Sequence, residues 1–176
     1  MNAEILKTEI LKLYRFKRQY YICATEVNTG IEIADILCMD DKEIIEIEIK
    51  ITWKDFLADF RKSKHLAIKP HLKYIYLKAN RFYFCVPSEI DEKCMNYLKD
   101  KNYEYGLIVY TTEQAYNRGK LIFNGKLTQI KRCKRLKELD TYEREKIKKW
   151  IIQRATSELV NLRDEKYKLD NTGVMC

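Results

Sequence analysis

EIIEIEIK, at residues 43–50, alternates isoleucine with charged residues and so has the two-residue period of a β-strand. Ile45, Ile47 and Ile49 fall on one face of that strand, as expected for a face that packs in a core. The other face carries Glu46, Glu48 and Lys50. Acid is concentrated there although the whole chain has a formal net charge of +8. The stretch predicts a central strand whose charged face is a candidate functional site.

Turn signals and further alternating runs surround this strand. Two such runs, 20–27 and 31–39, precede it, and each is followed by a short turn-forming segment. Together with residues 43–51 they predict an antiparallel meander of three strands. Thr52 and Asp55 then match the Ser/Thr-x-x-acid pattern of a helix start, and the helix is expected to end near Ser63.

The rest of the chain alternates helical and strand-like segments, which indicates an α/β fold. We predict a central mixed β-sheet flanked by helices, with αβββαβ order, a C-terminal hairpin and a long final helix. Residues 1–139 would form the main domain, and residues 140–170 would be a basic amphipathic helix of the same domain. The further expected elements are a helix over 3–16, a strand over 81–87, a helix over 88–98, a strand over 105–111, a hairpin turning at Asn124-Gly125 and a helix over 140–167.

Composition is that of a globular protein. The 176 residues are 46% apolar and 34% charged, which favours one domain with a real core over a disordered chain. No apolar run approaches the roughly 18 residues of a membrane span, and the N-terminus carries acids where a signal peptide has a positive flank, so we expect a cytoplasmic protein. The six cysteines are scattered without a CxxC pair, a pattern that does not favour a zinc site.

Charge is unevenly distributed along the chain. Residues 118–168 hold 16 Lys and Arg against seven Asp and Glu, whereas residues 31–48 hold seven acids and one lysine. A basic surface beside an acidic patch is expected where phosphates are bound and metal ions meet them. A solvated lysine-rich surface would explain the basic part equally well. The candidate phosphate contacts are the densest basic cluster, Lys131, Arg132, Lys134 and Arg135.

A candidate catalytic site follows from the meander. Because a tight turn joins the second and third strands, Asp35 can lie beside Glu48. Two ionised carboxylates at that separation repel each other unless a cation lies between them or they share a proton. Oxygen ligands of this kind suit Mg²⁺ or Mn²⁺. Lys50, on the same strand face as Glu48, could orient or help deprotonate a water and stabilise charge on a phosphate.

The spacing Asp-x12-Glu-x-Lys across a hairpin resembles the PD-(D/E)xK nuclease superfamily. The resemblance is carried by IADIL (33–37) and IEIK (47–50), followed directly by a helix. It implies a restriction-endonuclease-like core in which Asp35 and Glu48 bind the metal and Lys50 serves the attacking water. The backbone carbonyl of Ile49 would add a ligand, and the first helix would supply another acid, for which Glu9 is the candidate.

Further blocks are similar to the MmcB-like branch of these proteins, which is linked to DNA repair and mobile elements. That branch carries a D-F-x-x-D helix after the lysine, here at residues 55–59, and an aromatic strand ending in Val-Pro, here at 81–87. The chain departs from the superfamily pattern at Ala34, where a proline often stands. The resemblance implies a metal-dependent nuclease, with DNA expected over RNA and a role in repair, recombination or mobile elements.

Several residues have simpler interpretations. Glu46 is expected to be a solvent-facing polar neighbour outside the metal shell, and Asp55 and Asp59 a helix cap and a surface ion-pair partner. His65 is expected to be a hydrogen-bonded or surface residue, with nucleic-acid contact as the alternative. For the whole protein the alternatives are a nucleic-acid-binding adapter that does not cleave and a basic interaction protein, and the apolar stripe of 140–167 also allows a homodimer.

Overall fold

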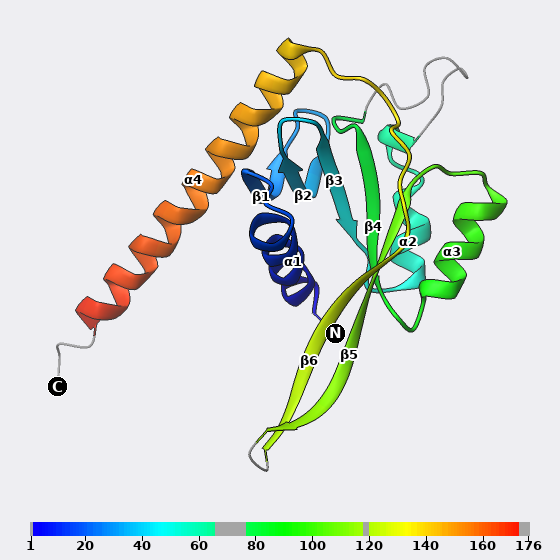
Figure 1. Cartoon of the computed structure of the whole chain (residues 1–176). Coiled ribbons are helices and arrows are strands. Elements are labelled where there is room, and N and C mark those ends of the chain that lie inside the picture. Colours follow the sequence, from blue (N-terminus) through cyan, green and yellow to red (C-terminus); the bar gives the residue numbers. More distant parts are fainter. Residues whose placement is uncertain (1, 66–76, 118–119, 173–176) are drawn as a thin grey trace.

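The structure is a computed structural model that describes residues 2–65, 77–117 and 120–172. These residues form a six-stranded mixed sheet flanked by helices, with a long C-terminal helix (Figure 1). The predicted α/β class is confirmed. The elements in chain order are α1 (Ala3–Lys12), a π-helical turn (Leu13–Lys17), β1 (Ile22–Asn28), β2 (Ile33–Met39), β3 (Ile44–Ile49), α2 (Trp53–Asp59), a 3₁₀ turn (Ser63–His65), β4 (Arg81–Pro87), α3 (Asp91–Asp100), β5 (Gly106–Asn117), β6 (Lys120–Lys131) and α4 (Thr141–Thr172).

Strand order in the sheet follows chain order from β1 to β6. The first three strands form the predicted antiparallel meander, in which Ile36 lies opposite Ile47. β4 runs parallel to β3, and β5 runs parallel to β4, because the connections that contain α2 and α3 return the chain to the same end of the sheet. β6 then pairs antiparallel with β5. This topology leaves β3 in the interior of the sheet.

Two apolar layers cover opposite faces of the sheet. On one face, α1 packs Leu6 against Ile45, Ile47 and Ile49 of β3. On the other face, Phe56 of α2 and Leu98 of α3 pack with Phe84 of β4. As a result all six residues of β3 are buried, including its two glutamates. The polar face of β3 lies under the α2 side of the molecule and not toward solvent.

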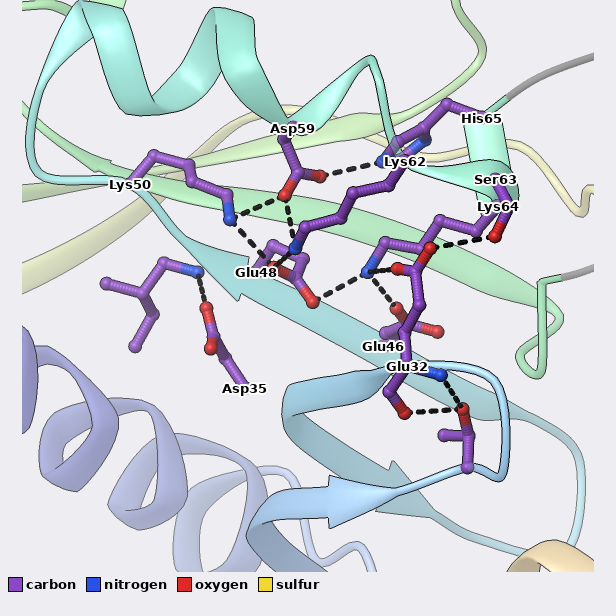
Figure 2. A network of polar contacts seen from close by, with 12 residues as sticks. Glu32, Asp35, Glu46, Glu48, Lys50, Asp59, Lys62, Ser63, Lys64 and His65 are labelled. Carbon is purple, nitrogen blue, oxygen red and sulfur yellow. Dashed lines mark hydrogen bonds and ion pairs between the residues drawn. The ribbon is translucent and has the colours of Figure 1, made fainter.

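α2 is shorter than its sequence pattern predicts. It begins as expected, with Oγ1 of Thr52 accepting the N–H of Asp55 at 3.1 Å. It ends at Asp59, and the chain then turns into the 3₁₀ segment Ser63–His65. Because the helix stops early, the residues after Asp59 fold back over β3 (Figure 2).

The expected turn at Asn124-Gly125 is wrong. β6 passes through both residues as a continuous strand paired with β5, and the two strands form a long ribbon that extends away from the rest of the sheet (Figure 1). Glycine has a packing role here, because a Cβ at Gly125 would collide with the ring of Tyr110. Gly125 therefore leaves space for the ring of Tyr110, and the chain does not reverse direction at Asn124-Gly125.

α4 crosses beside β1 and packs on the sheet over only part of its length. Ile147 and Ile151 are buried with residues of β1 and β2. Farther along the predicted apolar stripe, Leu159 and Leu162 are 52% and 63% exposed. Among the helices of the described residues, none has an apolar stretch of the length needed to cross a bilayer.

Candidate functional site

The structure brings the three predicted catalytic residues together. The pairing of Ile36 with Ile47 places Asp35 across from Glu48 on the same face of the sheet. Oδ2 of Asp35 accepts the backbone N–H of Ile49 at 2.8 Å, which fixes the carboxylate beside the end of β3 (Figure 2). Lys50 follows directly, and its Nζ donates to Oε2 of Glu48 at 2.8 Å.

Glu48 is fully buried and is surrounded by lysine ammonium groups. Its Oε1 accepts from Nζ of Lys64 at 2.7 Å. Its Oε2 accepts from Lys50 and also from Nζ of Lys62 at 3.2 Å. Burial acts to raise the pKa of Glu48, but the lysines outweigh it and lower that pKa below its ordinary value. Glu48 is thus held ionised in the interior.

Asp59 is a second buried carboxylate at the same place, and the expectation of a surface residue is wrong. Its Oδ1 lies 2.6 Å from Nζ of both Lys50 and Lys62. Although burial acts to raise its pKa, the bond from His65 and the nearby lysines lower the pKa of Asp59 strongly. The sequence carried one signal for this position, because Asp59 follows the core residue Phe56 by three residues and so shares its helix face.

His65 holds Asp59 in place. Its Nε2 lies 2.7 Å from Oδ2 of Asp59, and its Nδ1 lies 2.9 Å from the hydroxyl of Tyr105. Burial lowers the pKa of His65, although Asp59 opposes this, so the neutral ring is favoured. The neutral ring donates its Nε2–H to Asp59 and accepts at Nδ1. This placement favours a positioning role for His65 over direct contact with a phosphate.

Glu46 is also buried, so its expected place on the solvent side is wrong. The turn after α2 covers it, and its Oε1 accepts from Nζ of Lys64 at 2.7 Å. Burial raises the pKa of Glu46, and Lys64 only partly offsets this. Glu32 accepts a hydrogen bond from Ser63 and lies 3.8 Å from Nζ of Lys64. We call the following set the carboxylate–lysine cluster: Glu32, Asp35, Glu46, Glu48, Asp59, Lys50, Lys62 and Lys64.

The charge and donor atoms of the carboxylate–lysine cluster fit a divalent cation. With every carboxylate ionised, five negative charges face three ammonium groups, an excess of two. Burial raises the pKa of Asp35, and Glu48 acts in the same direction, as expected for carboxylates that share too little positive charge. The oxygen donors are those that Mg²⁺ and Mn²⁺ prefer.

A cation at Glu48 would have to replace an ammonium group. In the part of the chain that the structure describes, no three His, Cys, Asp or Glu side chains are arranged as a ready-made metal site. Both oxygens of Glu48 are already bonded to lysines. The candidate centre is therefore a site of suitable charge in which lysines neutralise the carboxylates.

Glu9 lies on α1, where its Oε1 pairs with Nζ of Lys12 at 2.7 Å. It lines a recess together with residues of α1 and with Gly125 and Leu127 of β6. Its proposed role as a metal ligand stays a prediction.

The predicted basic cluster lies at the end of β6 and just beyond it. Nζ of Lys131 donates to the backbone carbonyls of Tyr103 and Tyr105, and burial lowers its pKa. Lys131 thus ties β6 to the segment before β5. The other members are exposed: Arg132, Lys134, which pairs with Glu104, and Arg135, which pairs with Glu138.

A shallow basic recess adjoins this cluster. Lys131, Arg132 and Lys134 line it together with Lys99 of α3, a residue that the sequence did not single out. Lys131 also belongs to the cross-strand row that starts at Glu48, because each residue pairs with the next across β3 to β6. Three strand spacings, about 14 Å, separate the two ends of the row.

Comparisons of this chain with protein-family models, with curated proteins and with solved structures find no match.

Proposed function

We propose that the chain is a divalent-metal-dependent nuclease that hydrolyses phosphodiester bonds, with DNA as the expected substrate. The observation that carries the proposal is the convergence of Asp35, Glu48 and Lys50 at one end of β3. The same proposal includes the PD-(D/E)xK resemblance, its MmcB-like branch and a restriction-endonuclease-like arrangement of the core.

Asp35 and Glu48 would hold Mg²⁺ or Mn²⁺. The backbone carbonyl of Ile49 and the carboxylate of Glu9 are the candidates for further metal ligands. The metal would supply a water of lowered pKa and positive charge for the phosphate oxygens. Lys50 would act as a charged donor to the water or the phosphate. Burial acts to lower the pKa of Lys50, but Glu48 and Asp59 raise it above its ordinary value, which favours the protonated form.

The basic residues would position the nucleic acid without reading its sequence. Arg132 and Lys134 are exposed beside the recess, and Lys131 lies about 14 Å from Glu48 along the sheet. At a rise of about 3.4 Å per nucleotide, about four nucleotides span that distance. The direct line between the two ends crosses the buried Phe84 and Leu107, so a bound strand would pass around the α2–α3 layer and would be longer than this.

The direct test is cleavage of supercoiled plasmid, single-stranded DNA and RNA in Mg²⁺ or Mn²⁺. We expect metal-dependent cleavage by the wild type and its loss in Glu48→Gln and Lys50→Ala. Lys54→Ala is the matched control, because Lys54 is an exposed lysine on α2. Cleavage that survives both site variants would contradict the assignment.

A specific observation also favours a second function, a nucleic-acid-binding adapter that does not cleave. Both oxygens of Glu48 are bonded to lysines, so the carboxylate is neutralised without a metal. The adapter would bind nucleic acid with strong salt dependence and leave it intact in every metal tested. Filter binding between 50 and 300 mM salt, run beside the cleavage assay, distinguishes the two functions.

A further inference from the structure

Three lysines compete for one buried carboxylate, and they are not equivalent. Lys50 and Lys64 donate to Glu48 at 2.8 and 2.7 Å, whereas Lys62 lies farther away at 3.2 Å. The side chains of Lys50 and Lys64 are 10% and 4% exposed, and that of Lys62 is 36% exposed. Lys62 thus has the longest contact with Glu48 and the most exposed side chain of the three lysines, which surround Glu48 in Figure 2.

Lys62 also occupies a position between two carboxylates. Its Nζ contacts Oε2 of Glu48 and, at 2.6 Å, Oδ1 of Asp59. Nζ of Lys50 bridges the same two oxygens. The two carboxylate oxygens therefore face each other across positive charge, which is the requirement that a divalent cation would meet in their place.

The other two lysines are held in ways that Lys62 is not. Lys64 bridges Glu48 and the buried Glu46, so its departure would leave Glu46 without a counter-charge. The side chain of Lys50 is 10% exposed and its Nζ bonds Glu48 at 2.8 Å, so its ammonium is more enclosed and closer to Glu48 than that of Lys62. Release of Lys62 would leave Asp59 bonded to Lys50 and His65. Of the three lysines, Lys62 has the longest contact with Glu48 and the most exposed side chain, and its release leaves Glu48 bonded to Lys50 and Lys64.

We propose that Lys62 is an exchangeable cation of the candidate centre: its ammonium neutralises Glu48 and Asp59 in the metal-free protein and moves to solvent when a divalent cation enters. The inference rests on the proposed metal-dependent function and adds a carboxylate, Asp59, and a gating lysine to it. The exchange explains how the buried carboxylates of Glu48 and Asp59 are neutralised before the metal binds. Released into solvent, Lys62 would be free to contact a phosphate.

Binding of Mn²⁺ to the full chain, measured by electron paramagnetic resonance without nucleic acid, tests the exchange. Lys62→Met removes the competing ammonium but keeps the aliphatic stem. We expect it to bind Mn²⁺ at least about tenfold more tightly than the wild type, the change that about 1.4 kcal/mol represents. Arg61→Met removes a neighbouring exposed positive charge and is the control for long-range electrostatics. We expect it to stay within about twofold of the wild type.

Lysine labelling gives a second readout on the wild type. With an amine-reactive reagent and mass spectrometry, Lys62 should be modified faster in saturating Mn²⁺ than without metal, while Lys64 stays protected. Equal Mn²⁺ affinity in Lys62→Met and Arg61→Met, or no metal binding by any variant, would overturn the exchange. Cleavage assays on the same variants separate the exchange of Lys62 from the proposed nuclease function. Tighter Mn²⁺ binding by Lys62→Met without cleavage by any variant supports the exchange and rejects the nuclease.

Discussion

Nζ of Lys50 lies 2.6 Å from Oδ1 of Asp59, and this ion pair joins the end of β3 to the end of α2. Both side chains are largely buried, and the same ammonium also bonds Glu48. The contact adds the carboxylate of Asp59, from α2, to the face of β3 that carries Glu48. The cluster therefore contains residues that are distant in sequence.

Removal of the Asp59 charge should destabilise the fold. In Asp59→Asn, two lysines lose a buried counter-charge, and we expect a loss of about 2–4 kcal/mol in the free energy of unfolding. Asp55→Asn is the matched control on the same helix: Asp55 is exposed and the amide oxygen of the variant can keep the bond from Thr52, so it should lose less than about 1 kcal/mol. Urea denaturation measures both. An equal loss in the free energy of unfolding in the two variants would contradict a role of Asp59 as the buried counter-charge of Lys50 and Lys62.

Glu43 should make stability depend on pH. It accepts hydrogen bonds from Tyr20 at 2.5 Å and from Arg81. Burial acts to raise the pKa of Glu43, but these two bonds outweigh it and lower that pKa. Its contribution is therefore present above the unfolded-state pKa of about 4.3 and is lost as the pH falls through the folded-state pKa.

Glu43→Gln is accordingly expected to be about 1–2 kcal/mol less stable than the wild type at pH 7. The difference should shrink as the pH approaches 3, where the wild-type carboxyl takes up its proton. Urea titrations at several pH values measure it. A difference that is the same at pH 7 and pH 3 would rule out the ion pair as its source.

Substitution of an apolar side chain by alanine should affect the free energy of unfolding differently in the two halves of α4. Ile151 is fully buried against the sheet, so Ile151→Ala should lower the free energy of unfolding by about 2–4 kcal/mol. Leu159 belongs to the same predicted stripe but is 52% exposed, and Leu159→Ala should change stability by less than about 1 kcal/mol. A large loss in Leu159→Ala, growing with protein concentration, would instead indicate a subunit interface on this half of the helix.

The strand pattern at 43–50 predicted the frame well, because alternation over eight residues depends on local geometry alone. It identified the meander, the buried isoleucine face and the neighbours Asp35, Glu48 and Lys50. The same pattern could not show that the charged face is buried. That outcome depends on where α2 ends, and helix ends are set by tertiary contacts as much as by local sequence.

The contribution of Asp59, Lys62 and Lys64 to the cluster at Glu48 was missed for the same reason. The chain turns after Asp59, and the residues that follow fold back over β3: Lys62 and Lys64 contact Glu48, and His65 contacts Asp59. The Asn124-Gly125 turn failed because a nonlocal neighbour, the ring of Tyr110, needs the space at Gly125. Local sequence patterns thus predicted which helices and strands form, whereas contacts between residues distant in sequence determined where α2 ends and where β6 continues.

The most direct measurement of the central claim is the melting temperature with and without Mn²⁺. A cation held by Asp35 and Glu48 should raise the wild-type melting temperature by about 5–10 °C at a hundredfold excess over Kd. The shift should vanish in Asp35→Asn and persist in Asp55→Asn, whose side chain lies on the exposed face of α2. No shift in the wild type, or an equal shift in Asp35→Asn, would contradict a divalent-metal centre at the end of β3.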